Sequence, residues 1–363
     1  MPGNLYRAFF ISYRTKIYTF AVKITPMINN EIPDIFTRFN SLNALVIGDV
    51  MVDSYLWGKV ERISPEAPVP IVAVNKRENR LGGAANVALN IQALGATPIL
   101  CSVIGDESRG DSFSELLRKQ DMTDEGIIKS ANRITTTKFR IIGNHSQMLR
   151  VDEEVDNDLT EKETIQLYNR IAKLIETKNI DVIIFEDYDK GIITSLLISK
   201  VTELAQKKNI PVVADPKKKN FKNYTGISLF KPNLKELNEG LKLDITLANL
   251  SELSVAVDKL HEEKDIEMVM VTLSEAGVYI SKRDNETKNN GYSKVIPAHI
   301  RNIADVSGAG DTVISVASLC LALNLDIYLI ASLANLAGGL VCEEVGVVPI
   351  NKEKLIAEAL KIS

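Results

Sequence analysis

Short, uniformly apolar segments that alternate with segments of helical spacing constrain the fold of this chain most. The apolar segments span residues 43–50, 97–105, 181–187, 210–216, 226–233 and 266–273. Between them, stretches such as 81–95 and 108–120 repeat apolar side chains at the spacing of a helix. A strand that is apolar at every position must be covered on both faces, which is typical of parallel sheets between helices. We therefore expect an α/β fold with a mainly parallel central sheet and helices on both faces.

Two stretches break this alternation. Residues 57–77 contain three prolines and end in a β-prone run. Residues 133–154 place β-branched and aromatic residues on both sides of Gly143-Asn144, which is a typical hairpin turn. We expect lid strands within about residues 56–77 and 133–152 to form a small separate β sheet. The lid would belong to one domain over residues 41–363.

Residues 1–40 are predicted to be an N-terminal extension that is poorly ordered. Residues 1–30 contain no acid and carry Arg7, Arg14, Lys16 and Lys23 among aromatic residues. Their apolar runs are too short and too interrupted for a membrane span. A basic targeting or membrane-surface segment, which would make the chain an attached scaffold, is the alternative.

Composition excludes several functional classes. The net charge of -4 provides no strong basic field, so neither nucleic acid nor a membrane is an expected partner. Three cysteines lie in apolar stretches without a C-x-x-C pair. This usage favours reduced thiols in a cytoplasmic protein over a disulfide framework or a zinc site. Three histidines that lie far apart argue against a histidine-rich metal centre.

Polar residues follow several of the predicted strands. They occupy residues 48–53, 186–191, 215–219 and 231–236. Ligands of open α/β sheets bind beyond the carboxyl ends of the strands. We therefore expect a site where these stretches converge.

The run DVSGAGDTVIS, residues 305–315, carries the strongest local signal. The backbone of Gly308, Ala309 and Gly310 would lie at a helix N-terminus, where free N–H groups and the helix dipole attract an anion. Asp311 would then stand beside a bound phosphoryl group as a general base. The alternative is an ordinary helix start after a glycine turn, capped by Ser307 or Asp305.

A second glycine run contributes candidate sugar contacts. Gly82 and Gly83 would let a ligand approach the backbone, and Asn86 supplies a donor and an acceptor for sugar hydroxyls. Asp53 could accept hydrogen bonds from a diol. Tight helix-to-sheet packing explains the glycines and Asn86 equally well, and Asp53 could be an ordinary loop aspartate.

Asn233 and Glu236 share one face at the start of a predicted helix. They could hold a hydrated Mg²⁺ beside a nucleotide, with Glu236 acting through water. The same letters fit a capping box, in which the two residues only close the helix end.

Together these motifs resemble the ribokinase (PfkB-type) carbohydrate kinases. GGAAN and DVSGAGD match the two signature regions of that family, with N-x-x-E between them, and the likeness covers about residues 42–350. A closer resemblance is to the kinases of D-glycero-β-D-manno-heptose 7-phosphate in bacterial ADP-heptose synthesis. It is carried by ISPEAPVP, LGGAANVALNIQALGA, QMLRVDEE, EDYDKGIIT and KPNLKE. The resemblance implies a ribokinase-like fold and transfer of the ATP γ-phosphoryl to the anomeric hydroxyl, in lipopolysaccharide precursor synthesis.

The resemblance also implies roles for individual residues and for bound groups. ATP, Mg²⁺ and a monovalent cation are the expected cofactors. The expected residues are Asp311 as base with the Gly308-Ala309-Gly310 anion hole; Asp53, Gly82, Gly83 and Asn86 at the sugar; Arg150 and Lys190 at the 7-phosphate; Asn233, Glu236 and Lys217 on the ATP and Mg²⁺ side. For Arg150 and Lys190, a solvated or structurally paired charge is the alternative.

Partners follow from the same resemblance. We expect a homodimer through the β lid, as in related kinases. No H-x-G-H motif of a fused nucleotidyltransferase occurs, so a separate nucleotidyltransferase and a separate phosphatase are expected in the pathway. The alternatives are a kinase for another sugar or sugar phosphate, and a catalytically silent sugar-phosphate-binding protein.

Overall fold

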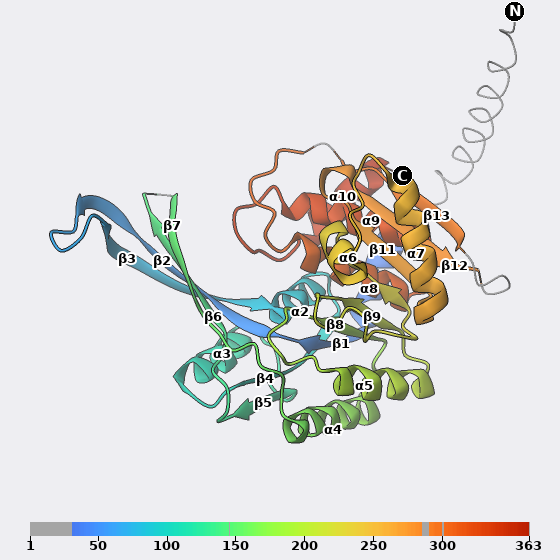
Figure 1. The fold of residues 1–363 in the computed structure, drawn as a ribbon, viewed down its shortest axis with the longest axis horizontal. Coiled ribbons are helices and arrows are strands. Elements are labelled where there is room, and N and C mark those ends of the chain that lie inside the picture. Colours follow the sequence, from blue (N-terminus) through green and yellow to red (C-terminus); the bar gives the residue numbers. More distant parts are fainter. Residues whose placement is uncertain (1–30, 145, 285–289, 300, 363) are drawn as a thin grey trace, which may run out of the picture.

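The computed structural model describes residues 31–362 apart from 145, 285–289 and 300. In this part of the chain a nine-stranded sheet has the order β13-β12-β11-β10-β9-β8-β1-β4-β5 (Figure 1). Seven strands run parallel: β1 (Asn43–Gly48), β4 (Thr97–Gly105), β5 (Ile127–Ser130), β8 (Val182–Glu186), β9 (Val212–Asp215), β10 (Leu229–Phe230) and β11 (Met268–Thr272). Two strands at one edge, β12 (Val278–Arg283) and β13 (Asn290–Ile296), pair antiparallel.

Helices cover both faces of the sheet and divide the core in two. Ala44 and Val46 of β1 belong to one apolar cluster, and the alternating Leu45 and Ile47 belong to the other. The first cluster packs under α2 (Ala84–Ala93), α3 (Ser108–Lys119), α8 (Ala309–Ala322), α9 (Ile327–Val341) and α10 (Lys352–Ile362). The second packs under α4 (Glu161–Thr177), α5 (Ser195–Lys208), α6 (Leu234–Leu241) and α7 (Leu250–Lys264). The predicted sheet with helices on both faces is confirmed.

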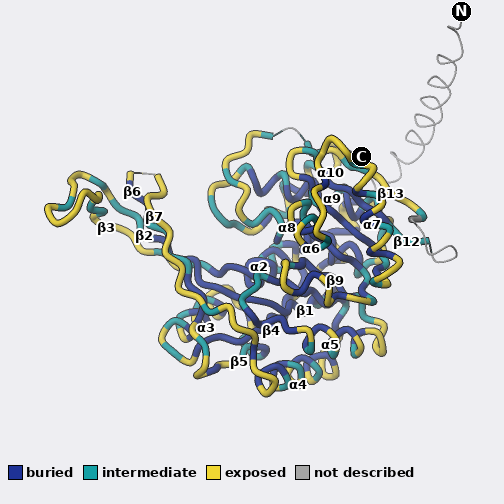
Figure 2. The backbone as a smooth tube through the Cα atoms, in the orientation of Figure 1, coloured by how far each residue is buried: buried dark blue, intermediate teal, exposed yellow. Residues whose placement is uncertain are grey.

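Four strands form a second sheet that we call the arm. They are β2 (Val50–Ile63), β3 (Pro70–Gly83), β6 (Thr137–Gly143) and β7 (Ser146–Glu153), in the order β3-β2-β6-β7. Figure 1 shows the arm projecting from the body. β2 and β3 extend beyond the predicted range of 56–77, because β2 starts two residues after β1 and β3 runs directly into α2, whereas β6 and β7 lie within the predicted range of 133–152 to within one residue. Figure 2 shows that the arm is buried at its base and exposed toward its tip.

Residues 31–41 differ from the prediction of a poorly ordered extension. Residues 31–38 are helical and lead into the short helix η1 (Phe39–Ser41). Ile32, Ile35, Phe36 and Phe39 are buried in the first core cluster. The predictions for residues 1–30 lie outside the described residues. Among the described helices, none combines the length and the apolar character that crossing a membrane requires.

Candidate active site

Asp311 lies in the first turn of α8 with both carboxylate oxygens held. Asn86 Nδ2 donates to Oδ2 over 2.6 Å, and the Tyr188 hydroxyl donates to Oδ1 over 2.7 Å. The pKa of the Asp311 carboxyl is raised because burial outweighs these two hydrogen bonds, which lower it by favouring the charged form. The site therefore holds an oriented carboxylate at a helix N-terminus.

The glycine turn before Asp311 leaves the start of α8 without a side-chain cap. Gly308 is the N-cap residue in a left-handed conformation, with φ of 82°. Asp305, the predicted alternative cap, accepts from Ser307 N at 3.0 Å instead. The first backbone N–H groups of a helix point out of its end, so the uncapped turn suits an anion.

The junction between the arm and α2 lies close to Asp311. It contains Gly82, Gly83 and Asn86. A Cβ on Gly83, whose φ is 61°, would lie 2.3 Å from the Asp49 carbonyl oxygen. A Cβ on Gly82 would lie 2.3 Å from Asp53 Oδ2. A side chain at either position would therefore collide with these oxygens, so both glycines serve close packing of the arm's base. Asn86 is buried, and its Oδ1 has no hydrogen-bond partner among the described residues.

The face of the arm that carries Asp53 also carries basic residues that the sequence analysis missed. Asp53 is buried in an ion pair with Arg140. The guanidinium carbons of Arg80 and Arg140 lie 4.9 and 5.3 Å from the centroid of the Tyr55 ring. A strand places every second side chain on one face, and the register pairs Asp53 with Lys138 and Tyr55 with Arg140. These side chains therefore line one face at the base of the arm.

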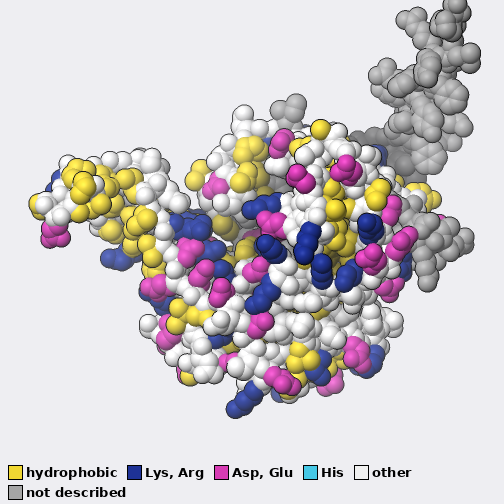
Figure 3. All heavy atoms as spheres, viewed as in Figure 1, with side chains coloured by type: hydrophobic (Ala, Val, Ile, Leu, Met, Phe, Trp, Pro, Cys, Tyr) yellow, Lys and Arg dark blue, Asp and Glu magenta, His cyan; other side chains and the backbone are white. Residues whose placement is uncertain are grey.

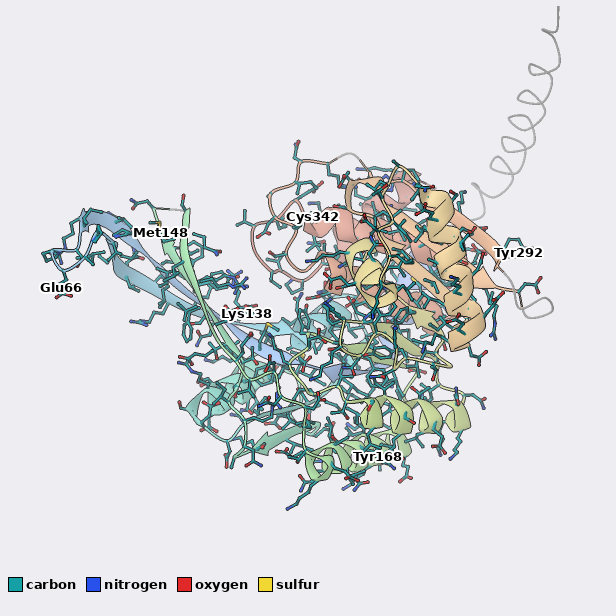
Figure 4. All side chains as sticks on the ribbon, in the orientation of Figure 1. Glu66, Lys138, Met148, Tyr168, Tyr292 and Cys342 are labelled. Atoms are coloured by element: carbon teal, nitrogen blue, oxygen red, sulfur yellow. The ribbon has the colours of Figure 1, made fainter. Side chains whose placement is uncertain are left out.

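Lys138 is a cation of this face that lies beside Tyr188. Its Nζ lies 6.0 Å from the ring centroid of Tyr188, the residue that donates to Asp311. Burial lowers the pKa of Lys138, and the lysine forms no ion pair within the described part of the chain. Figure 4 labels Lys138 where the arm meets the body, and Figure 3 shows basic side chains gathered in this region. The charges of Asp53, Asp152 and Glu154 act on Lys138 without forming an ion pair, and a partly desolvated ammonium in this state favours an anionic ligand.

The two residues predicted to bind the 7-phosphate are both paired with acids. Lys190 Nζ lies 2.7 Å from Glu154 Oε1. Arg150 Nε lies 3.0 Å from Asp152 Oδ1, and its side chain is 53% exposed on β7. The structure therefore shows these charges in the paired state that the alternative interpretation described.

Asn233 and Glu236 form the capping box of α6. Glu236 N donates to Asn233 Oδ1 over 2.8 Å, and Asn233 N donates to Glu236 Oε2 over 2.8 Å. Lys217 forms an ion pair with Glu236 and lies 3.8 Å from Asp215 Oδ1. Burial opposes the charge of Lys217, yet these carboxylates raise its pKa. The described residues contain no group of three His, Cys, Asp or Glu side chains placed to hold a metal ion.

Comparison with known proteins is consistent with this geometry. The family described as pfkB family carbohydrate kinase matches residues 41–354. The bifunctional protein HldE of Geotalea uraniireducens is 35% identical over 332 residues, which cover 92% of this chain and 66% of that protein. The HldE of Aliarcobacter butzleri is 39% identical over 304 residues, 84% of this chain and 61% of that protein. The chain thus spans less than two thirds of the length of these relatives.

Solved structures show the same fold. Phosphofructokinase-2 from Escherichia coli in complex with potassium superimposes with a TM-score of 0.69 at 18% identity, covering 88% of this chain and 98% of that one. Ribokinase from Arabidopsis thaliana, complexed with ribose and ATP, gives 0.64 at 15% identity, covering 89% and 99%. With its ribokinase-like fold and the match over residues 41–354, the chain belongs to the pfkB family of carbohydrate kinases.

Proposed function

We propose that this kinase phosphorylates the anomeric hydroxyl of D-glycero-β-D-manno-heptose 7-phosphate to give the 1,7-bisphosphate, in the synthesis of ADP-heptose. The single observation that carries the reaction type is the Asp311 carboxylate, fixed by Asn86 and Tyr188 at the uncapped N-terminus of α8. The choice of heptose phosphate is supported by the resemblance of ISPEAPVP and the other quoted stretches. Turnover of a different sugar phosphate is the second candidate.

The chemistry assigned to the chain is a proton transfer and the stabilisation of charge. Asp311 accepts the proton of the anomeric hydroxyl while that oxygen bonds to the γ-phosphorus of ATP; the bond between this phosphorus and the bridging oxygen of ADP breaks, and ADP leaves with the electron pair. The amide N–H groups of the Gly308-Ala309-Gly310 turn stabilise negative charge on the phosphoryl oxygens. Gly82 and Gly83 permit the close packing that brings Asp53 and Asn86 to the sugar side of Asp311.

We assign the nucleotide and its metal to the side of Asn233, Glu236 and Lys217. Lys217 would bind phosphate oxygens, and Glu236 would contact Mg²⁺ through water. Bound Mg²⁺ neutralises charge that develops on the phosphate oxygens. A monovalent cation remains a prediction for this chain; the phosphofructokinase-2 structure in complex with potassium makes it worth testing.

For the 7-phosphate we add Lys138 and Arg140 to the predicted Arg150 and Lys190. Lys138 is the stronger candidate of the four, because Arg140, Arg150 and Lys190 already face carboxylates. A phosphate placed at the base of the arm would replace the water that partly solvates the ammonium of Lys138.

The arm also supports the predicted homodimer. The exposed apolar side chains of the arm and of its β2–β3 loop are Ile63, Val69, Val74, Met148, Leu149 and Val151. Figure 3 shows hydrophobic side chains over the projecting end of the arm. Two such surfaces that cover one another would remove this apolar area from water.

A coupled assay of ADP release from Mg-ATP tests the function. The acceptors are the heptose 7-phosphate, the same heptose without phosphate, ribose, fructose 1-phosphate, adenosine and no acceptor. We expect turnover with the heptose 7-phosphate and a phosphorus spectrum of the product that shows a new anomeric phosphate. Preferred turnover of another acceptor would retain the kinase mechanism and reject the heptose assignment.

A further inference from the structure

Three charged residues under the glycine turn have no part in the roles assigned so far. Glu186 and Asp215 are the last residues of β8 and β9 and lie side by side in register. Lys231 directly follows β10, the next strand of the sheet. The residues two positions earlier all belong to the core cluster under α8, namely Ile184, Val213 and Leu229. Since strand side chains alternate, the three charged groups project toward the same face as α8 and Asp311.

Lys231 and Asp215 form a buried ion pair directly beneath Gly310. Lys231 is 2% exposed, and its Nζ lies 2.7 Å from Asp215 Oδ2. A Cβ built on Gly310 would lie 3.7 Å from Asp215 Oδ2 and 3.8 Å from Lys231 Nζ. The residue next to Gly310 is Asp311, and the charges of both members of the pair act on its carboxylate.

Lys231 and Asp215 are the two main charged residues that act on the Asp311 carboxylate, and their effects are opposite. Tyr188 and Asn86 donate hydrogen bonds to the carboxylate, and Lys217 is engaged by Glu236. Glu186 is buried, and neither of its carboxylate oxygens has a hydrogen-bond partner in the described part of the chain. Burial, together with the charges of Asp215 and Asp311, raises the pKa of Glu186, which favours its neutral form.

The ammonium of Lys231 and the carboxylate of Asp215 act on Asp311 in opposite directions. The ammonium favours the ionised form of Asp311, and the carboxylate disfavours it. Both effects are stronger here than at a surface because the groups are removed from water.

We propose that Lys231 is a positioning residue for phosphoryl transfer: anchored by Asp215 under Gly310, its ammonium keeps Asp311 ionised and able to accept the proton of the sugar hydroxyl. This inference rests on the proposed role of Asp311 as base. Lys231 acts through the protonation state of Asp311 and does not touch the substrate.

The test is the pH dependence of kcat at saturating substrates, in which the acid limb reports protonation of the base in the ternary complex. Lys231→Met keeps the apolar length but removes the charge, and should move the acid limb upward by about 1 pH unit. Asp215→Asn leaves the ammonium without its counter-charge, and should move the limb downward. Lys231→Arg, the matched control, should keep the limb near that of the unsubstituted enzyme.

Both substitutions break the same ion pair, so structural disruption should affect the two variants alike. Shifts of the acid limb in opposite directions therefore indicate an electrostatic effect on Asp311. Acid limbs that move in the same direction, or that do not move, overturn the inference. Thermal unfolding and nucleotide binding are measured for every variant. If Lys231→Met fails to fold, an unshifted limb in Asp215→Asn still overturns it. Full turnover of Asp311→Asn would instead reject Asp311 as the base, and the acid limb of the pH profile would then not report its protonation.

Discussion

Asn86 Nδ2 and Asp311 Oδ2 lie 2.6 Å apart although 225 residues separate them in the chain. The contact joins the start of α2 to the start of α8 and fixes the orientation of a buried carboxylate. The contact thus brings Asn86, a candidate for sugar binding, next to Asp311, the candidate base for phosphoryl transfer. The consequences for activity follow from the groups around this contact.

Replacing Asp311 with asparagine should abolish most turnover. The amide keeps the shape of the side chain but cannot accept a proton, and loss of general-base catalysis typically costs roughly 100- to 10,000-fold in rate. We expect kcat in the ADP-release assay to fall within this range. Nucleotide binding, measured by titration calorimetry, should stay within about twofold because the N–H groups of the turn remain. Activity near that of the unsubstituted enzyme would remove Asp311 from the role of base.

Replacing Tyr188 with phenylalanine should shift the acid limb of the kcat profile to higher pH. The hydroxyl donates to Asp311 Oδ1 and lowers the pKa of that carboxyl. Without it the pKa rises, so Asp311 becomes protonated, and activity is lost, at a higher pH than before. We expect a shift of about 0.5–1 pH unit, with the basic limb unchanged. A shift to lower pH would show that the hydroxyl does not stabilise the carboxylate.

Replacing Gly83 with alanine should destabilise the protein. Its φ of 61° disfavours a side chain, and the added Cβ would meet the Asp49 carbonyl oxygen at 2.3 Å. We expect the midpoint of thermal unfolding to fall by about 3–8 °C. Gly339→Ala in α9 is the matched control, because its φ is not positive and its Cβ would meet a side chain, that of Arg301 at 3.3 Å, rather than backbone. Equal losses in both variants would contradict the packing argument.

The layered fold could be predicted because uniformly apolar strands admit few arrangements. The helix at residues 31–38 was missed, although Ile32, Ile35, Phe36 and Phe39 follow helical spacing and carried the signal. The range predicted for β2 and β3 was too narrow, because residues 50–55 resemble the polar edge of β1 rather than the start of β2.

The site was partly predictable. The motifs GGAAN and DVSGAGD contain Asn86, Asp311 and the glycines, and few functions require these residue types at this spacing. Lys138 and Arg140 stand in an ordinary alternating strand, so their relevance depends on the register that pairs them with Asp53 and Tyr55. Lys231 looks like a surface lysine after a short strand, and its burial becomes intelligible only with Asp215 beside it.

Replacing Lys138 with methionine should weaken binding of the sugar phosphate more than replacing Arg150 with alanine. Lys138 is half-buried and without an ion pair, whereas Arg150 is 53% exposed and faces Asp152. A charge-assisted hydrogen bond contributes about 1.5–3 kcal/mol, so the KM for the sugar phosphate should rise roughly 10- to 100-fold in Lys138→Met. In Arg150→Ala we expect a rise of at most about fivefold, since exposed pairs contribute little. The KM for ATP should stay the same in both variants. The sugar without its phosphate provides the internal control: if Lys138 binds that phosphate, its substitution should not affect the weak turnover of the unphosphorylated sugar. Equal losses with both sugars would place Lys138 in a structural role, and an unchanged KM for the sugar phosphate would remove it from the phosphate site.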